Sequence, residues 1–200
     1  QVTLTTPSGG GSWSASGTYT VAWQASDADG GTLYSNLLYS RDNGATWNPA
    51  AVNLTATQYG INAALLAGSA QALFRVEVSD GLNTAADQSD AAFTVPAKAP
   101  LVWITGPEDG AMVDVGAQVV LQGMATDLED GPITDGTRFR WTSSLEGELG
   151  TGRTLFFEDL LPGRHTITLT VTDGQRFEGS DRVTIFIGYP IYLPLVTKAP

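Results

Sequence analysis

The feature that most constrains the fold is a series of four short motifs that recurs in the same order in both halves of the chain. The offset between the copies drifts from about 100 residues at the first motif to 91 at the last, from residue 89 to residue 180. Small differences in loop length produce such a drift in two copies of one fold. The paired segments are 26–30 with 126–131, 65–68 with 160–163, 76–81 with 169–174, and 89–90 with 180–181. The sequence therefore predicts two modules of one architecture.

A segment bracketed by Pro96 and Pro100 separates the two copies. Proline fixes φ and restricts the residue before it, so this linker is predicted to be extended and semi-rigid. We predict a first module at residues 1–97, a second module at 98–188, and a C-terminal tail or linker at 189–200. Segment 197–200 repeats the composition of the linker, which leaves room for a further module after it.

Alternation of apolar and polar residues with a period of two predicts strands in both halves. The one stretch with a helical pattern, 61–67, is too short to form a free helix. Roughly seven short strands per module, with turns about every 8–12 residues, predict an all-β protein of two tandem immunoglobulin-like antiparallel β-sandwiches. The residues predicted to face inward are Tyr19, Val21, Trp23, Phe74, Val76, Val78, Phe93 and Val95 in the first module, and Val119, Leu121, Gly123, Phe139, Trp141, Ile167, Leu169, Val171, Val183, Ile185 and Ile187 in the second.

The composition excludes several kinds of partner and site. The chain has 21 acidic and 10 basic residues, and its formal charge of −11 repels nucleic acid and anionic lipid and attracts cations. It has no cysteine, which rules out disulfides and zinc sites with thiolate ligands. No apolar run reaches the roughly 18 residues that a membrane span requires. We therefore expect neither nucleic-acid binding nor membrane insertion.

The two modules resemble two groups of extracellular domains. In segments 125–131, 141–147 and 163–173 the second module is similar to the PKD-like and Ig-like repeats of secreted bacterial proteins. The first module resembles fibronectin-III-like and Ig-like modules appended to secreted hydrolases, especially metallopeptidases, and segment 192–196 is similar to the C-terminal ends of some secreted bacterial proteins. Because the chain begins at Gln1 without an initiator Met or a signal peptide, we interpret it as part of a longer secreted or cell-surface polypeptide.

Residues 40–47 fit the Asp-box pattern S-x-D-x-G-x-T-W through Ser40, Asp42, Gly44, Thr46 and Trp47. Aspartate suits the turn, glycine supplies a positive φ, and the tryptophan is expected to pack back across the hairpin. Asp-boxes occur in sialidases and other sugar-active propellers, where the box resembles a fold-stabilising hairpin away from the active site. The pattern therefore predicts a structural hairpin rather than a substrate site.

Acidic loops are the best functional candidate in the sequence. In an Ig-like sandwich the loop after the second strand and the loop before the last strand lie at the same end. Carboxylate and carbonyl oxygens on adjacent loops are the ligands of Ca²⁺, which extracellular modules bind with Kd of about 10⁻⁴–10⁻³ M. The candidate ligands are Asp27, Asp29 and Asp80 in the first module and Asp127, Glu129, Asp130 and Asp173 in the second.

The competing interpretation of these loops is that Asp and Asp-Gly simply make good turns. The spacing is not that of an EF-hand loop, whose terminal glutamate is missing. The second cluster is expected near the linker, where calcium would stiffen a two-module rod as in cadherin-like arrays. No cofactor is required, and calcium is the one candidate ligand.

The remaining residues of chemical interest are one histidine and four tryptophans. His165, the only histidine, lies on the inward alternation of its strand, which predicts a buried and hydrogen-bonded side chain; a Ser-His-Asp triad would need it, and no nucleophile elbow accompanies it. Trp23 and Trp141 are predicted to lie in the cores. Trp13, after a glycine run, and Trp103, near the linker, are the candidates for exposed aromatics that stack on sugars or anchor a partner protein.

These features predict a non-catalytic, monomeric spacer or interaction module in the C-terminal part of a larger secreted or surface protein, with the other domains of the polypeptide as its partners. The alternative is a carbohydrate- or protein-binding accessory domain of a secreted hydrolase. A patch of exposed aromatics on a sheet face would favour the alternative, whereas Thr, Ser and charges there would favour the spacer. An enzyme would require a concave pocket with convergent titratable groups.

Overall fold

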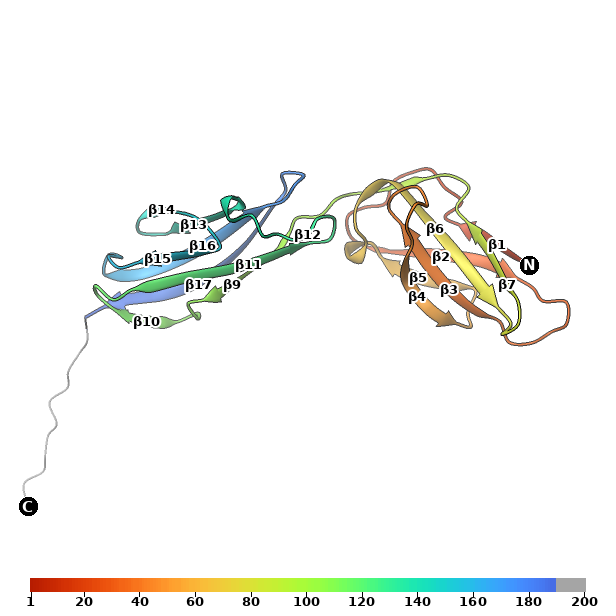
Figure 1. Ribbon diagram of the computed structural model, residues 1–200, viewed down its shortest axis with the longest axis horizontal. Coiled ribbons are helices and arrows are strands. Elements are labelled where there is room, and N and C mark those ends of the chain that lie inside the picture. The colour runs from red at the N-terminus through yellow and green to blue at the C-terminus, as the bar shows by residue number, and fades with distance from the viewer. Residues whose placement is uncertain (190–200) are drawn as a thin grey trace, which may run out of the picture. The chain divides into compact units, whose positions relative to one another are not determined.

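The computed structural model describes residues 1–189. The chain divides into two compact units, Gln1–Lys98 and a second unit that begins at Ala99 (Figure 1). Residues 190–200, which hold most of the predicted tail and the segment 192–196, lie outside the described residues. None of the helices within residues 1–189 is long and apolar enough to cross a bilayer.

The first module is an antiparallel β-sandwich. One sheet has the order β1-β2-β5, and the other has the order β4-β3-β6-β7, with β8 also paired to β6. The helical pattern at 61–67 corresponds to a single 3₁₀ turn, η1. The elements are β1 (Val2–Thr6), β2 (Thr18–Ala25), β3 (Tyr34–Ser40), β4 (Asn48–Leu54), β5 (Gln58–Asn62), η1 (Ala63–Leu65), β6 (Ser69–Ser79), β7 (Thr84–Gln88) and β8 (Phe93–Val95).

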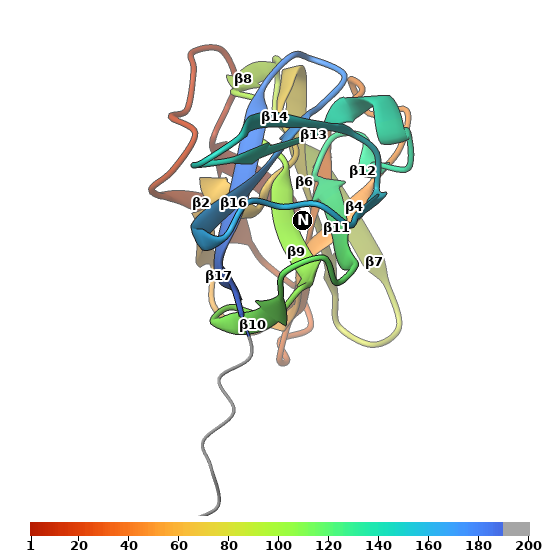
Figure 2. The same cartoon turned by 90° about the vertical axis from the view of Figure 1, so that its left-hand side faces the viewer.

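The second module is also a two-sheet sandwich. In one sheet β11 pairs with β9, β12 and β15, and the other sheet has the order β10-β17-β16-β13-β14 (Figure 2). Within the second sheet β10 runs parallel to β17. The elements are β9 (Leu101–Gly106), β10 (Ala111–Asp114), β11 (Val119–Asp127), β12 (Gly131–Pro132), η2 (Gly136–Arg138), β13 (Phe139–Ser143), β14 (Gly147–Thr151), β15 (Thr154–Phe157), β16 (Gly163–Thr172) and β17 (Glu178–Gly188).

The predicted fold class is confirmed, because both modules have the sheet order of an immunoglobulin-like sandwich. The alternation also placed the core correctly. Tyr19 is partly buried. The other residues predicted to face inward that have a side chain belong to the two buried cores.

A tryptophan lies in each core, but on different strands. Trp23 on β2 is 3% exposed. The matching residue of the second module is Gly123 on β11, because Trp23 pairs with Leu4 of β1 and Gly123 pairs with Ile104, the corresponding residue of β9. The second module carries its core tryptophan, Trp141, on β13. A Cβ added to Gly123 would lie 2.3 Å from Cδ2 of Leu169 and 3.2 Å from the Trp141 ring, so glycine makes room for these side chains.

The register corrects one pair of repeat motifs. Segment 89–90 was matched with 180–181, but Ser89 follows β7 whereas Ser180 and Asp181 lie inside β17. Asp181 pairs with Leu169, and the residue that pairs with the equivalent Val76 is Asp87. The true offset here is 94, from residue 87 to residue 181, close to the 93 that relates residue 80 to residue 173.

Asp87 and Asp181 make equivalent hydrogen bonds in the two modules. The Asp87 carboxylate accepts a hydrogen bond of 2.7 Å from the backbone N–H of Leu4, and the Asp181 carboxylate accepts one of 2.8 Å from that of Ile104. Both donors stand at a register shift of the first strand, where the regular ladder is interrupted. The aspartates therefore satisfy the same backbone position in each module.

Candidate functional site

The second module brings three of its candidate acidic residues together at one end of the sandwich. Asp127 ends β11 and Asp173 follows β16, and each continues the inward-facing alternation of its strand. Both side chains are buried, at 5% and 4% exposure. Because β11 and β16 belong to opposite sheets, both carboxylates point into the space between the sheets. Glu129 is half-buried and Asp130 is exposed in the loop between β11 and β12.

Each buried carboxylate closes its own loop with one oxygen. Asp127 Oδ1 accepts hydrogen bonds from the backbone N–H groups of Glu129 and Asp130, at 2.8 and 2.9 Å. Asp173 Oδ1 accepts from those of Gln175 and Phe177, both at 2.8 Å. These bonds are those of turn-forming aspartates, as one of the two interpretations expected. The second oxygen, Oδ2, of both aspartates is buried and has no hydrogen-bond partner.

Asp130 joins the two loops. Its Oδ2 accepts a hydrogen bond of 2.8 Å from the backbone N–H of Gly174, and its Oδ1 accepts one of 3.3 Å from Nε2 of Gln175. A Cβ on Gly174 would lie 2.5 Å from the same Asp130 oxygen, so a side chain at this position would displace the Asp130 carboxylate. The loop after β11 and the loop before β17 are thus held in contact.

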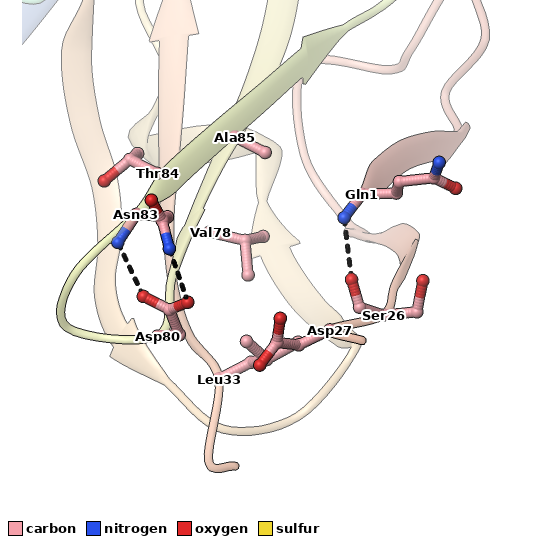
Figure 3. Close-up of a pocket in the computed structure, with 9 residues that line it drawn as sticks. All are labelled: Gln1, Ser26, Asp27, Leu33, Val78, Asp80, Asn83, Thr84 and Ala85. Atoms are coloured by element: carbon pink, nitrogen blue, oxygen red, sulfur yellow. Dashed lines mark hydrogen bonds between the residues drawn. The ribbon is translucent and has the colours of Figure 1, made fainter. Parts of the chain in front are cut away.

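The first module places two of its three candidates in one small pocket of about 110 Å³, lined by Gln1, Ser26, Asp27, Leu33, Val78, Asp80, Asn83, Thr84 and Ala85. Figure 3 shows the Asp27 and Asp80 carboxylates near one another, with Leu33 and Val78 beside them. Asp29 is exposed and does not line the pocket. The loops therefore gather Asp27 and Asp80 and leave Asp29 apart.

Asp80 differs from its counterpart Asp173 in having partners at both oxygens. Its Oδ1 accepts from the backbone N–H groups of Asn83 and Leu82, at 2.6 and 2.7 Å, and its Oδ2 accepts from Nδ2 of Asn83 at 3.3 Å. These hydrogen bonds, the one from the Asn83 backbone above all, hold the pKa of Asp80 below its ordinary value. Asp80 is a satisfied turn residue.

Within residues 1–189 no group of three or more Asp, Glu or His side chains converges closely enough to bind a metal by itself. Any cation at either acidic end would therefore take part of its ligands from backbone carbonyls and water.

Residues 40–47 form the predicted hairpin between β3 and β4. The Ser40 hydroxyl is buried and accepts the backbone N–H of Gly44 at 2.8 Å, while Asp42 accepts the N–H of Thr46 at 2.8 Å and its hydroxyl at 2.6 Å. The Trp47 ring lies 3.4 Å from where a Gly44 Cβ would be. The hydrogen bonds from Thr46, with one from Ser40, lower the pKa of Asp42 to about 2. These groups bond to one another within the hairpin, which gives them a structural role.

His165 is buried at 0% exposure, as predicted. Its Nε2 lies 2.7 Å from the carbonyl oxygen of Leu161 and its Nδ1 lies 2.8 Å from Oγ of Ser143. Since a carbonyl only accepts, Nε2 carries the proton, and Nδ1 accepts from the Ser143 hydroxyl. A serine beside a histidine resembles a nucleophile and its base, but both side chains are sealed in the core. The pair stabilises the fold.

The outer face of the β9-β11-β15 sheet carries exposed apolar side chains, of which the sequence predicted only Trp103. Trp103 is 42% exposed and pairs with Met124, which is 47% exposed; Phe156, 65% exposed, pairs with Val120. Period-two alternation could have shown Met124 and Phe156 as outward residues, since their neighbours Ala125 and Leu155 face inward.

The same face of the first module is polar. Its residues at the matching positions are Thr3, Gln24, Gly60 and Thr20, in place of Trp103, Met124, Phe156 and Val120. Trp13, expected to be exposed, is instead partly buried: its ring stacks on Tyr19 at 4.3 Å and packs against Phe93 at 4.9 Å. The glycine run before Trp13 did not reveal this, because the packing partners lie in other strands.

Comparison with known proteins finds similarity to several solved structures of tandem sandwich domains. The fibronectin(III)-like modules of Clostridium thermocellum CbhA are 19% identical, with a TM-score of 0.40, over 94% of this chain and 95% of that one. The N-terminal four Ig domains of Dscam1 isoform 6.9 are 12% identical, with a TM-score of 0.38, over 94% of this chain and 46% of that one. Three N-terminal domains of the bacteriophage RB49 Hoc protein are 13% identical, with a TM-score of 0.36, over 94% and 57%.

No family model and no curated protein matches the chain. With TM-scores below 0.5, the solved structures add no argument about function. The fold assignment rests on the strand order and register of the two modules themselves.

Proposed function

We propose that the chain is a non-catalytic spacer and interaction part of a larger extracellular protein. The observation that carries this proposal is the pairing of β10, the second strand of the second module, with β17, its last strand. The parallel ladder of β10 and β17 runs from Ala111–Ile185 to Asp114–Gly188 and is extended by the bond from the Val115 N–H to the Gly188 carbonyl, at 2.9 Å. Tension along the chain loads these bonds in shear, so that they resist together rather than one at a time.

The chemistry of the cores supports the same role. The polar atoms of three buried aromatic side chains are hydrogen-bonded within the fold: Trp23 Nε1 donates to Ser35, the Tyr39 hydroxyl donates to the Ala67 carbonyl, and Trp141 Nε1 donates to the Gly152 carbonyl. The one histidine is engaged in the core as well. These groups stabilise sandwiches and are withheld from any substrate.

Single-molecule pulling on the full chain tests the spacer. We expect two unfolding events, each releasing roughly 300 Å of chain. The first module has a comparable parallel contact, because Ser12 pairs with Thr94 and the N–H of Trp13 bonds to the Thr94 carbonyl at 2.8 Å. Val115→Pro removes the N–H that bonds Gly188 and should lower the unfolding force of the second module, whereas Thr5→Pro, at the bulge of β1, serves as the matched control. If Val115→Pro left both unfolding forces unchanged, the role as a mechanical spacer would be contradicted.

A second function, an accessory module that binds a carbohydrate or a protein, is favoured by the exposed face of Trp103, Met124 and Phe156. Flat aromatic side chains stack on sugar rings and anchor protein partners. The test is a glycan array together with capture of the remaining domains of the polypeptide. Trp103→Thr with Met124→Gln copies the polar face of the first module and should abolish any signal. Phe186→Thr, on the opposite sheet, is the control and should retain it.

A further inference from the structure

We infer that the second module binds one calcium ion between its two sheets, at the end where Asp127 and Asp173 are buried. The site does not depend on the spacer role. Acidic loops alone would not indicate it, because Asp127 Oδ1 and Asp173 Oδ1 are fully accounted for by the turns that they close. What the turns leave unexplained is the second oxygen of each side chain.

A turn needs only one acceptor oxygen, which asparagine would also supply. The structure instead has two carboxylates, each more than nine-tenths buried and each with an Oδ2 atom that no donor reaches. Buried polar atoms are almost always paired with a donor, with water or with an ion, since burial strips them of solvent. The two unpaired oxygens therefore point to a ligand.

The charge at this position calls for a cation. Arg75 pairs with Glu77 and Arg138 pairs with Asp135, so neither arginine neutralises Asp127 or Asp173. Two carboxylates that are buried between opposite sheets at one end of the module repel one another unless a positive charge lies between them. The Asp130 bridge to Gly174 and Gln175 keeps the two loops together despite this repulsion.

Calcium fits the available ligands better than other common cations. Carboxylate oxygens are hard ligands, and Ca²⁺ accepts irregular sets of six to eight oxygens, whereas Mg²⁺ demands a near-ideal octahedron. Since these side chains do not form a ready-made group of three within residues 1–189, backbone carbonyls and water complete the shell. A partly aqueous shell corresponds to weak binding, with Kd of about 10⁻⁴–10⁻³ M as in extracellular modules.

The direct test is a titration of the full chain with CaCl₂, followed by amide NMR spectra. We expect saturable shifts of the Glu129, Asp130, Gln175 and Phe177 amides, which hydrogen-bond to the two aspartates, and much smaller shifts with MgCl₂. The Leu82 and Asn83 amides, which bond to Asp80, are the internal control and should move little. Absence of saturable shifts at millimolar calcium, or equal shifts at Asp80, would overturn the inference.

Two variants test the ligands themselves. Asp127→Asn and Asp173→Asn keep the oxygen that closes each turn and remove the charge; Asp80→Asn is the matched control in the first module. Saturating calcium should raise the unfolding midpoint of the wild-type chain and of Asp80→Asn by several degrees, and should leave both other variants unchanged. A wild-type shift in Asp173→Asn would overturn the inference. If a variant fails to fold, the wild-type NMR titration decides.

The chelated state gives a further check. Without calcium, Asp127→Asn and Asp173→Asn should unfold no lower than the wild type, because each removes an uncompensated buried charge. A large loss of stability in chelator would mean that the carboxylate already has a partner within the fold, and would count against a cation site.

Discussion

The two modules carry aspartates at matching places and use them differently. Asp27 and Asp80 of the first module border a small pocket, and Asp80 has hydrogen-bond partners at both oxygens. Their counterparts Asp127 and Asp173 are buried, and each has one oxygen without a partner. The same local motif therefore makes a solvated turn in one module and a charged interior in the other. The burial of the loop, rather than its composition, separates a turn from a candidate ion site.

The cores show the same divergence between equivalent positions. In the first module the Tyr39 hydroxyl donates to the Ala67 carbonyl at 2.7 Å. In the second module a carbonyl of the corresponding segment 160–163, that of Leu161, is reached by His165, which Ser143 supports from the strand position that matches Tyr39. A carbonyl of the same segment is therefore bonded by a tyrosine in one copy and by a serine–histidine pair in the other.

The largest effect should come from removing the core tryptophans. Trp141→Ala and Trp23→Ala should each lower the free energy of unfolding of their own module by about 3–5 kcal/mol, through lost burial and the cavity left behind. Denaturant titration with residue-resolved amide exchange measures this. If the tryptophans are equivalent solutions on different strands, the two losses should agree within about 1 kcal/mol; a difference several times larger would show that one core collapses around the gap.

A smaller change in the free energy of unfolding should follow from exchanging the two ways of hydrogen-bonding this loop carbonyl, that of Ala67 in the first module and that of Leu161 in the second. His165→Ala should lower the free energy of unfolding of the second module by about 2–4 kcal/mol, because it leaves the Leu161 carbonyl unpaired and opens a cavity. Adding Ser143→Tyr to His165→Ala copies the first module, and should recover about 1 kcal/mol or more through the new hydrogen bond. Urea denaturation of the single and double variants measures the recovery. A double variant less stable than His165→Ala would show that a tyrosine cannot replace the serine–histidine pair in the second module.

The smallest effect is local and concerns the hairpin at 40–47. Bonds from Thr46 depress the pKa of Asp42 from 3.8 to about 2 in the folded chain, so the hairpin's contribution is complete above pH 3.8 and is lost as the pH falls through about 2. The carboxyl ¹³C titration of Asp42 and the exchange rate of the Thr46 amide measure this.

The second module provides the comparison. Its β13–β14 turn, at 144–146, holds no aspartate and therefore lacks a network of this kind. Asp42→Asn is the matched variant and should make the Thr46 amide insensitive to pH. An Asp42 that titrates near 3.8 would contradict the network.

Much of the fold could be predicted because it depends on local patterns. Alternation identified the inward side chains of the long strands, and the hairpin at 40–47 followed from residues close together in the chain. The repeat showed two copies, although the last pair of motifs was matched wrongly, since Ser89-Asp90 resembles Ser180-Asp181 in letters but not in register. Similar dipeptides do not reveal which residue of the partner strand they face.

The candidate site could be predicted only as a set of residues. The sequence indicated that seven acidic side chains lie in turns. It did not indicate that Asp29 would stand apart, that Asp130 would join two loops, or that Asp127 and Asp173 would be buried. Each of these facts depends on contacts between loops that are more than 40 residues apart, such as that of Asp130 with Gly174.

The sequence by itself determined the strands, the two modules and the inward position of His165, because backbone preference and side-chain period act over a few residues. The tertiary structure alone decided which carboxylates lost their solvent and that Trp13 is packed against the core while Trp103 stays exposed. Burial is a property of the packed sheets, and the two unpaired oxygens of Asp127 and Asp173 arise only where strands from both sheets meet.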